Sequence, residues 1–379
     1  MITYKYRLYS NDKNKHLHQA INVSGLIWNH CVALQRRYYR ITGKYISKYD
    51  LMKHIAKLRN RQKYSHWQLV GSQAVQGIVE RLDAAYQRFF KYKAGKTTQC
   101  SGRPSFKKVK LYKSFTLKQA GWKLLGGNRI RILGQTYKFS KSREIDGAIK
   151  TVTVKRDELG HIWLCFAVAG GTYPDPVTSS NIVGADFGLK TFLTLSDGTT
   201  VESPLFYKNA LNEIRRLNQE LSRKQKGSHN RRKAKLALAK AHERIANLRR
   251  DWFFKLAHKL TDKFDVIVLE DLNIKAMQRR WGRKVSDLGF ASFVGILQYV
   301  AVKKGKIVKF VGRFFPSSKT CSACGEVNHS LELSDRYWVC MACGAYHDRD
   351  HNASVNIERE GASSLGLGDV RPGIPAFAV

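Results

Sequence analysis

The sequence predicts an α+β multidomain protein. We expect a small β-barrel or sheet with an inserted helical domain, then an α/β domain that carries an inserted four-cysteine ribbon. Apolar and polar residues alternate in short stretches between glycines over residues 114–170, a pattern typical of β-strands. Over residues 207–262, apolar residues instead recur at helical spacing. Two Cys-x₂-Cys pairs further along the chain indicate the ribbon.

The composition favours a polyanionic partner. The 379 residues include 67 Lys and Arg against 29 Asp and Glu, a formal net charge of +38. This excess is far beyond what solubility requires, and it predicts salt-sensitive binding to phosphates. No apolar run reaches the roughly 18 residues of a membrane span, so nucleic acid is favoured over a membrane. The N-terminal residues lack the apolar core of a signal peptide, which predicts a cytoplasmic protein, associated with the nucleoid if bacterial.

The first half of the chain is predicted to combine strands and helices. Aromatic or apolar residues alternate with basic ones over residues 3–9, which indicates a half-buried strand that joins the later ones. Apolar stripes at helical spacing follow, and we interpret them as the core of a helical region. Residues 96–118 contain no acidic side chain and include Gly102-Arg-Pro-Ser-Phe-Lys-Lys108, a basic loop with turn-forming residues.

Beyond a predicted linker at residues 173–176, the pattern changes to mixed α/β. The long helical region is broken at Gly227 and Ser228, which predicts a helical hairpin; its turn, residues 223–235, carries seven basic residues and no acidic one. Asp197 precedes a glycine and is expected in a tight hairpin turn. The remaining elements are expected as strands at residues 182–186, 192–195, 266–269 and 307–311 and as a helix at 288–303.

The cysteine spacing predicts a structural zinc site. Two Cys-x₂-Cys pairs are separated by fifteen residues, and each is followed by a glycine that suits a tight turn; the four candidate ligands are Cys321, Cys324, Cys340 and Cys343. Four thiolates leave no open coordination position, so catalytic zinc is disfavoured. The alternative, a chance cluster of free thiols, does not explain the paired glycines.

Three acidic residues occupy distinctive positions. Asp186 and Glu270 each end an apolar strand, and Asp350 lies where a helix is expected to begin. Side chains at the carboxyl ends of such strands face the ligand crevice of α/β sheets. Each residue alone also has a structural explanation, since an acidic residue in a first helical turn compensates the helix dipole. Together they predict one metal site, because phosphodiester hydrolysis with two Mg²⁺ ions needs converging carboxylates.

These motifs resemble those of the TnpB family, the OrfB proteins of bacterial insertion sequences, which are related to the type V CRISPR effectors. The resemblance covers most of residues 1–358 and rests on four segments: Gly184–Leu189, Val268–Asn273, Ser317–Gly325 and Cys340–Ala353. Less usual residues stand at a few positions, namely Ser10, Ala185, Phe187 and Ser354, and none of them replaces a carboxylate.

The resemblance implies a domain layout and an activity. In that family the acidic segments build a RuvC nuclease domain of the RNase H type, and Asp186, Glu270 and Asp350 match its catalytic triad. Members bind a guide RNA and cleave double-stranded DNA beside a short flanking motif. The implied domains are a wedge β-barrel (1–10 and 97–175), a helical recognition domain (11–96), a RuvC-like nuclease domain (176–316 and 346–360), a zinc ribbon (317–345) and a disordered tail (361–379).

The expected mechanism is hydrolysis by two Mg²⁺ ions about 3.5–4 Å apart, held by the triad, in a monomer or weak dimer. The helical hairpin is expected to contact the guide–target duplex, and a loop after Glu270 to hold single-stranded DNA. The candidate nucleic-acid contacts are Gln73, Gln76, Arg103, Lys107, Arg223, Lys224, Arg231, Arg232, Arg279, Arg280 and Trp281. Ordinary helix-surface glutamines and a solvated connector are the simpler alternatives for Gln73, Gln76 and that loop.

Three other functions fit parts of the pattern. A DNA transposase or strand transferase also uses a carboxylate triad on an RNase H fold. A non-cleaving RNA-guided repressor would normally have lost a carboxylate, whereas this chain keeps all three. A zinc-ribbon protein that binds nucleic acid without catalysis is the third. Replacing Asp186 by alanine separates these functions from a nuclease.

Overall fold

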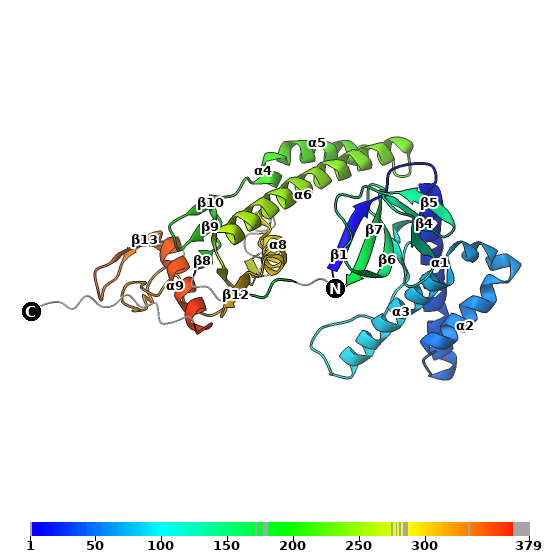
Figure 1. Ribbon diagram of the computed structural model, residues 1–379, viewed down its shortest axis with the longest axis horizontal. Helices are drawn as coiled ribbons and strands as arrows, with labels where there is room; N and C mark the ends of the chain where they lie inside the picture. The colour runs from blue at the N-terminus through cyan, green and yellow to red at the C-terminus, as the bar shows by residue number, and fades with distance from the viewer. Residues whose placement is uncertain are drawn as a thin grey trace, which may run out of the picture. The chain divides into compact units, whose positions relative to one another are not determined.

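The computed structural model describes residues 2–170, 173–176, 181–273, 276–277, 279, 282, 287–332 and 334–366. The chain forms two compact units, Met1–Thr172 and Tyr173–Val379, and each is described by itself (Figure 1). The mixture of helices and sheets in both units confirms the α+β class. Among the described residues, no helix is long and apolar enough to cross a membrane.

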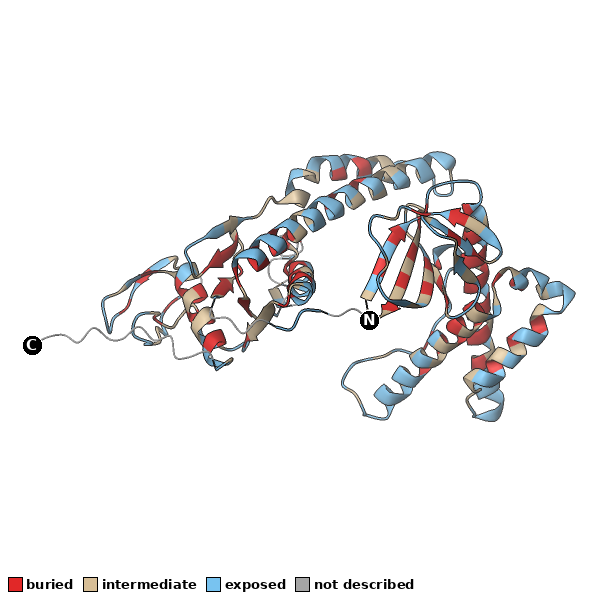
Figure 2. Ribbon diagram, in the orientation of Figure 1, coloured by how far each residue is buried: buried red, intermediate tan, exposed pale blue. Residues whose placement is uncertain are grey.

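The first unit contains two antiparallel sheets. One has the order β1-β7-β6-β2, formed by Ile2–Arg7, Ile162–Ala169, Ala148–Arg156 and Ser114–Leu117; the other has the order β3-β4-β5, formed by Trp122–Leu124, Arg129–Ile132 and Gln135–Lys138. The N-terminal strand therefore joins the sheet, as predicted, with Tyr6 opposite Leu164. Inward residues alternate along β7, which Figure 2 shows as alternating buried and half-buried positions.

The predicted β-barrel is wrong, because the described strands form open sheets. Among the described residues the two sheets are connected by one bridge, between Leu8 and Phe139, and do not close on each other. The edge strand β2 is instead covered by a helix, α3 (Ser72–Lys93). A Cβ atom added to Gly77 of that helix would lie 3.3 Å from the Thr116 carbonyl oxygen. A helix packed this closely protects a sheet edge without a further strand.

Helices occupy the segment inserted after β1, as predicted. They are α1 (Asn14–Thr42), α2 (Lys48–Arg59), the 3₁₀ turn η1 (Gln62–Leu69) and α3. The predicted apolar stripe of α1 is buried, and Leu17, Ile21 and Cys31 within it are fully so. The basic loop before β2 is tied to α1, because Asn29 Nδ2 donates to the Lys107 carbonyl at 2.8 Å and Asn29 Oδ1 accepts from Lys107 N–H at 2.8 Å.

The second unit is built on a five-stranded sheet of order β10-β9-β8-β11-β12. Its strands are Thr200–Glu202, Thr191–Leu195, Ile182–Asp186, Val266–Glu270 and Ile307–Val311. The strands β8, β11 and β12 run parallel; β9 is antiparallel to β8, and β10 pairs antiparallel with β9. Asp197 closes the β9–β10 turn, as predicted, by accepting from Thr199 N–H at 2.9 Å.

Helices cover both faces of this sheet. Ile267 and Leu269 of β11 face a core shared with α6 and α8, whereas Val266 and Val268 pack with Ile357 of α9. Because β11 is buried on both faces, its sequence is a continuous apolar run rather than an alternating one. The helices are α4 (Phe206–Asn209), α5 (Leu211–Ser222), α6 (His229–Lys263), α8 (Phe290–Lys303) and α9 (Arg349–Ser363).

Three local predictions are refined by the structure. The predicted hairpin of α5 and α6 is present, and Ser228 caps α6 by accepting from Arg231 N–H at 3.1 Å. The helix expected from residue 288 begins at Phe290. The disordered tail was predicted to begin at Gly361, but α9 continues to Ser363. The rest of the predicted tail, residues 367–379, lies outside the described residues.

Candidate active site and metal centre

Two of the candidate carboxylates end neighbouring parallel strands. Asp186 is the last residue of β8 and Glu270 the last of β11. The strands run parallel with Leu269 opposite Ala185, so the next residue of each strand emerges at the same edge of the sheet. This is the carboxyl edge, where ligands bind in sheets of this type.

The third carboxylate is brought to this edge by α9. Asp350 lies in the first turn of the helix, which is capped by Asp348 accepting from His351 N–H at 2.8 Å. The helix lies directly on β8, since a Cβ atom added to Gly184 would come within 2.0 Å of the Ser354 carbonyl oxygen. A glycine is therefore what permits this close approach.

The charges of Glu270 and Asp350 both act on Asp186. Burial raises the pKa of Asp186 well above its usual value, and the nearby charges of Glu270 and Asp350 raise it further. Arg349 acts in the opposite direction. Burial also raises the pKa of Glu270, against a hydrogen bond donated by Ser317 Oγ. At Asp186 and Glu270, where burial raises the pKa, a cation bound nearby would favour the charged carboxylates.

Arginine side chains hold Asp350. Arg336 Nη1 lies 2.7 Å from Asp350 Oδ2, and Arg349 Nη2 lies 3.4 Å from Oδ1. The oxygens of Asp186, Glu270 and Asp350 are not among the sets of described ligand atoms that lie within 4.8 Å of one another. Their donor set nevertheless suits Mg²⁺, which prefers carboxylate oxygens.

The four cysteines do form such a set. The Sγ atoms of Cys321, Cys324, Cys340 and Cys343 all lie within 4.8 Å of one another. Both pairs have the same turn: Gly325 N–H donates to the Cys321 carbonyl at 2.9 Å and Gly344 N–H to the Cys340 carbonyl at 2.8 Å. Both glycines have positive φ, as the prediction required. Four converging sulfur atoms fit a closed tetrahedral zinc site.

Several residues of the site were not predicted from the sequence. His347 Nε2 lies 3.0 Å from Cys321 Sγ. Ser317 and Arg336 contact Glu270 and Asp350, whereas Asn352 and Asn356 bind the cysteine segment to α9. All of them lie within or beside the motif segments. Their position in or next to these segments was the available signal.

The predicted nucleic-acid contacts of the first unit lie on its surface. Gln73 and Gln76 are half-buried on α3. Arg103 and Lys107 line a groove of about 920 Å³ that contains no acidic side chain. Trp28, Phe106 and Tyr112 also line it, with Arg81, Arg88, Lys108 and Lys113. Cations interleaved with aromatic rings suit phosphates and bases.

The predicted nucleic-acid contacts of the second unit differ in whether their side chains are free to bind a ligand. Arg223, Lys224 and Arg232 are exposed near the α5–α6 turn. Arg231 is instead used internally, because its Nη1 atom donates to the Leu221 and Lys224 carbonyls at 2.6 and 2.8 Å. Arg279 is exposed. The predictions for Arg280 and Trp281 lie outside the described residues.

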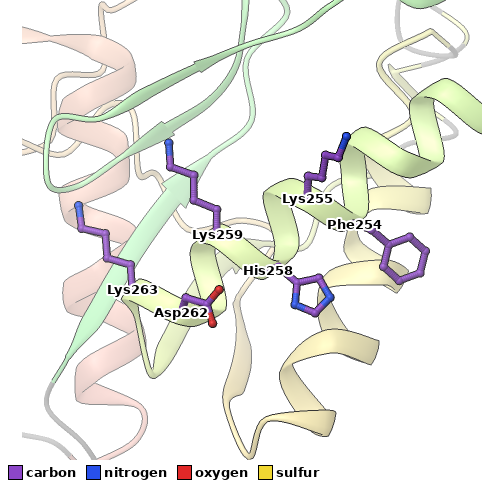
Figure 3. Close-up of a pocket in the computed structure, with 6 residues that line it drawn as sticks. All are labelled: Phe254, Lys255, His258, Lys259, Asp262 and Lys263. Carbon is purple, nitrogen blue, oxygen red and sulfur yellow. The ribbon is translucent and has the colours of Figure 1, made fainter. Parts of the chain in front are cut away.

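A further basic surface lies on α6. Figure 3 shows Lys255, Lys259 and Lys263 extending to one side of the helix, away from Phe254 and His258. These lysines precede β11, whereas Glu270 ends it, and Lys263 therefore lies near the opposite end of that strand from the carboxylates. The surface is not part of the candidate active site.

The chain matches models of two protein families. Residues 152–280 match OrfB_IS605, described as "Probable transposase", and residues 290–357 match the family "Cas12f1-like, TNB domain". A Streptomyces pristinaespiralis protein named "Putative RNA-guided DNA endonuclease" is 28% identical over 97% of this chain and 92% of its own length. The Escherichia coli protein InsQ, of the same designation, is 27% identical over 91% of this chain and 88% of its own length.

The fold is similar to that of solved effector structures. The Cas12f1 chain of a complex with sgRNA and target DNA superposes with a TM-score of 0.58, at 17% identity, over 93% of this chain and 83% of its own. The structure of the mini-RNA-guided endonuclease CRISPR-Cas phi3 superposes with a TM-score of 0.52 at 10% identity, over 98% of this chain and 93% of its own. The chain thus resembles the OrfB (TnpB) proteins in residues 152–280 and the Cas12f1-like TNB domain in residues 290–357, and over most of its length it is similar to proteins named RNA-guided DNA endonucleases.

Proposed function

We propose that the protein is an RNA-guided DNA endonuclease of a transposable element, which cleaves DNA beside a short flanking motif. Its relatives in Streptomyces pristinaespiralis and Escherichia coli carry names for this activity. The observation that carries the proposal is the meeting of Asp186, Glu270 and Asp350 at one edge of the sheet, where the pKa of Asp186 responds to both other charges.

The proposed chemistry is metal-assisted hydrolysis of a phosphodiester bond. Divalent ions such as Mg²⁺ would supply an activated water and stabilise the leaving 3′ oxygen. Asp186, Glu270 and Asp350 would hold these ions. Burial and the two neighbouring charges raise the pKa of Asp186, and a bound cation would act in the opposite direction by favouring the charged carboxylate. Arg336 and Arg349 would orient the Asp350 carboxylate.

The remaining partners are proposed from charge and chemistry. Guide RNA and target DNA would bind the groove at Arg103 and Lys107 and the exposed cations of the α5–α6 turn. Residues 317–345 would form a zinc ribbon, since four thiolates suit that ion. The four domains implied by the family, and a place near the bacterial nucleoid, belong to the same proposal.

Replacing Asp186 by alanine tests the proposed function. The full chain would be purified with the RNA that accompanies it, the RNA sequenced, and plasmids carrying the matching target incubated with Mg²⁺. Asp186→Ala should reduce cleavage by more than the roughly 10–100-fold that loss of an outer-shell partner causes. The matched control is Asp251→Ala, which removes an exposed carboxylate paired with Lys255 at 2.8 Å and should cleave normally. Cleavage by Asp186→Ala at the wild-type rate would refute the assignment.

Strand transfer is the second candidate, because one matching family model is described as a transposase. A strand transferase would join the cut ends to a second DNA. The same reactions, run with a labelled acceptor duplex, distinguish the two activities. Joined products that disappear in Asp186→Ala would favour the transferase, and cut products alone favour the nuclease.

A further inference from the structure

The four-cysteine segment contacts two of the three carboxylates through its own side chains. Ser317 lies before the first cysteine pair, is 3% exposed, and donates from Oγ to the Glu270 carboxylate. Arg336 lies between the two pairs and bonds Asp350 Oδ2 at 2.7 Å. One segment therefore contacts a carboxylate on β11 and another on α9.

Two buried asparagines of α9 hold the first arm of this segment. Asn356 Nδ2 donates to the Ser317 carbonyl at 2.8 Å and to the Thr320 carbonyl at 2.6 Å. Asn352 Nδ2 donates to the Thr320 carbonyl at 2.7 Å, and Asn352 Oδ1 accepts from Ser322 N–H at 2.9 Å. These backbone groups flank the first cysteine, so a buried network connects that ligand to Ser317. Such satisfied polar networks specify one arrangement of the groups they join.

The second arm is held by a short hairpin. Its strands are β13 (Tyr337–Val339) and β14 (Tyr346–Asp348), and β14 leads directly into α9. Arg349 N–H donates to the Arg336 carbonyl at 2.8 Å, which fixes the backbone of Arg336 beside the start of the helix. The position of its guanidinium therefore depends on the folded hairpin.

The segment has little core of its own apart from the cysteines. Its buried cluster consists of Cys321, Leu331, Trp338 and Cys340, so half of these residues are candidate metal ligands. A module this small generally needs a metal to keep its fold. An ion bound by all four thiolates would fix the two arms relative to each other.

We propose that Ser317 and Arg336 are positioning residues through which the metal-loaded cysteine cluster sets the geometry of the carboxylate site. The inference rests on the proposed function, because it takes Glu270 and Asp350 as ligands of the catalytic ions. It assigns the cysteine segment a role beyond its own folding: loss of its metal weakens divalent-metal binding at the carboxylates while the five-stranded sheet remains folded.

The first test measures metal binding in the full chain with its accompanying RNA, using Mn²⁺ as the probe. Ser317→Ala should raise the Mn²⁺ concentration for half-maximal thermal stabilisation by about 10-fold or more, and cleavage should recover as Mn²⁺ is raised. Ser317→Thr keeps the hydroxyl and should restore binding. The matched control is Ser330→Ala, which removes a hydroxyl of the same segment that donates to Asn328 at 2.7 Å. Zinc content should match the wild type in all three variants.

A double-mutant cycle tests the coupling to the cysteine cluster. Cys324→Ser should release zinc and weaken Mn²⁺ binding, and adding Ser317→Ala should weaken it little further, because loss of the folded cluster already removes the Ser317 contact. Fully additive effects would refute the coupling. Should Cys324→Ser fail to fold, the comparison of Ser317→Ala with Ser330→Ala decides alone, and equal Mn²⁺ binding there overturns the proposal.

The two proposals fail in distinguishable ways. Continued cleavage by Asp186→Ala would refute the proposed function itself. An inactive Asp186→Ala, together with a Ser317→Ala variant that binds Mn²⁺ as Ser330→Ala does, would refute the positioning role alone.

Discussion

Asp186 and Asp197 lie near ends of strands in the same sheet but experience opposite electrostatic environments. Burial and the charges of Glu270 and Asp350 raise the pKa of Asp186. Burial acts in the same direction on Asp197, but hydrogen bonds from Lys263 and Thr199 outweigh it and lower the pKa. A buried carboxylate held near other carboxylates opposes stability, which is a common compromise at functional sites.

This difference predicts opposite effects on stability. A raised folded-state pKa means that the folded protein loses stability as pH rises above the unfolded value, so Asp186 destabilises the metal-free protein at about pH 7. Asp186→Asn should therefore increase the free energy of unfolding by roughly 0.5–2 kcal/mol in denaturant titrations without divalent ions. Asp197 has a lowered pKa and contributes stability that is lost as pH falls, so Asp197→Asn should decrease it. A destabilised Asp186→Asn would contradict this account.

At the scale of elements, the position of α9 determines where Asp350 lies. The helix packs against β8 at Gly184 and against β11 at Gly361, where an added Cβ would come within 2.4 Å of Val268 Cγ2. Glycine at both positions lets the backbone of the helix and the sheet approach closely. The strand pattern predicted the sheet, but local sequence carries no information on how closely a helix approaches it.

Substitution of Gly184 tests this packing. In Gly184→Ala the new methyl group would overlap the Ser354 carbonyl, so α9 must shift and carry Asp350 with it. We expect a loss of roughly 1–3 kcal/mol in the free energy of unfolding, together with reduced cleavage. The control is Gly295→Ala on α8, where an added Cβ has open space and helix propensity improves. Equal stability of the two variants would show that α9 adapts without cost.

At the scale of the whole molecule, the net charge of +38 favours a polyanionic partner, and the described basic residues differ in how available they are to bind one. Some cations are already used within the protein: Arg231 bonds backbone carbonyls, and Lys263 pairs with Asp197 at 2.6 Å. Exposed Arg223 and Lys224 lie in a turn without acidic residues. Net charge therefore predicts the class of partner, whereas the fold decides which cations are available to it.

Salt dependence measures that availability. Replacing both Arg223 and Lys224 by alanine should make the logarithm of the DNA-binding constant fall less steeply with the logarithm of the salt concentration. The slope should decrease by about one for each phosphate that the variant no longer neutralises, and the decrease should be the same for all DNA sequences. The control replaces Lys15 and Lys141, which pair with Asp12 at 2.8 Å and Glu144 at 2.5 Å, and should leave the slope unchanged. Fluorescence anisotropy between about 50 and 200 mM salt provides the measurement. An equal slope for both double variants would exclude the hairpin turn as a nucleic-acid contact.

The amino-acid sequence by itself determined the α+β class, the strand and helix periods, the cysteine ligand set and the three carboxylates as candidates, because each is written in local spacing. Only the tertiary structure decided that α3 covers the edge of β2 in place of a closed barrel. It also revealed that Arg231 serves its own turn and that Ser317 and Arg336 hold Glu270 and Asp350. These outcomes depend on contacts between residues far apart in the chain, and such contacts arise only when the elements pack.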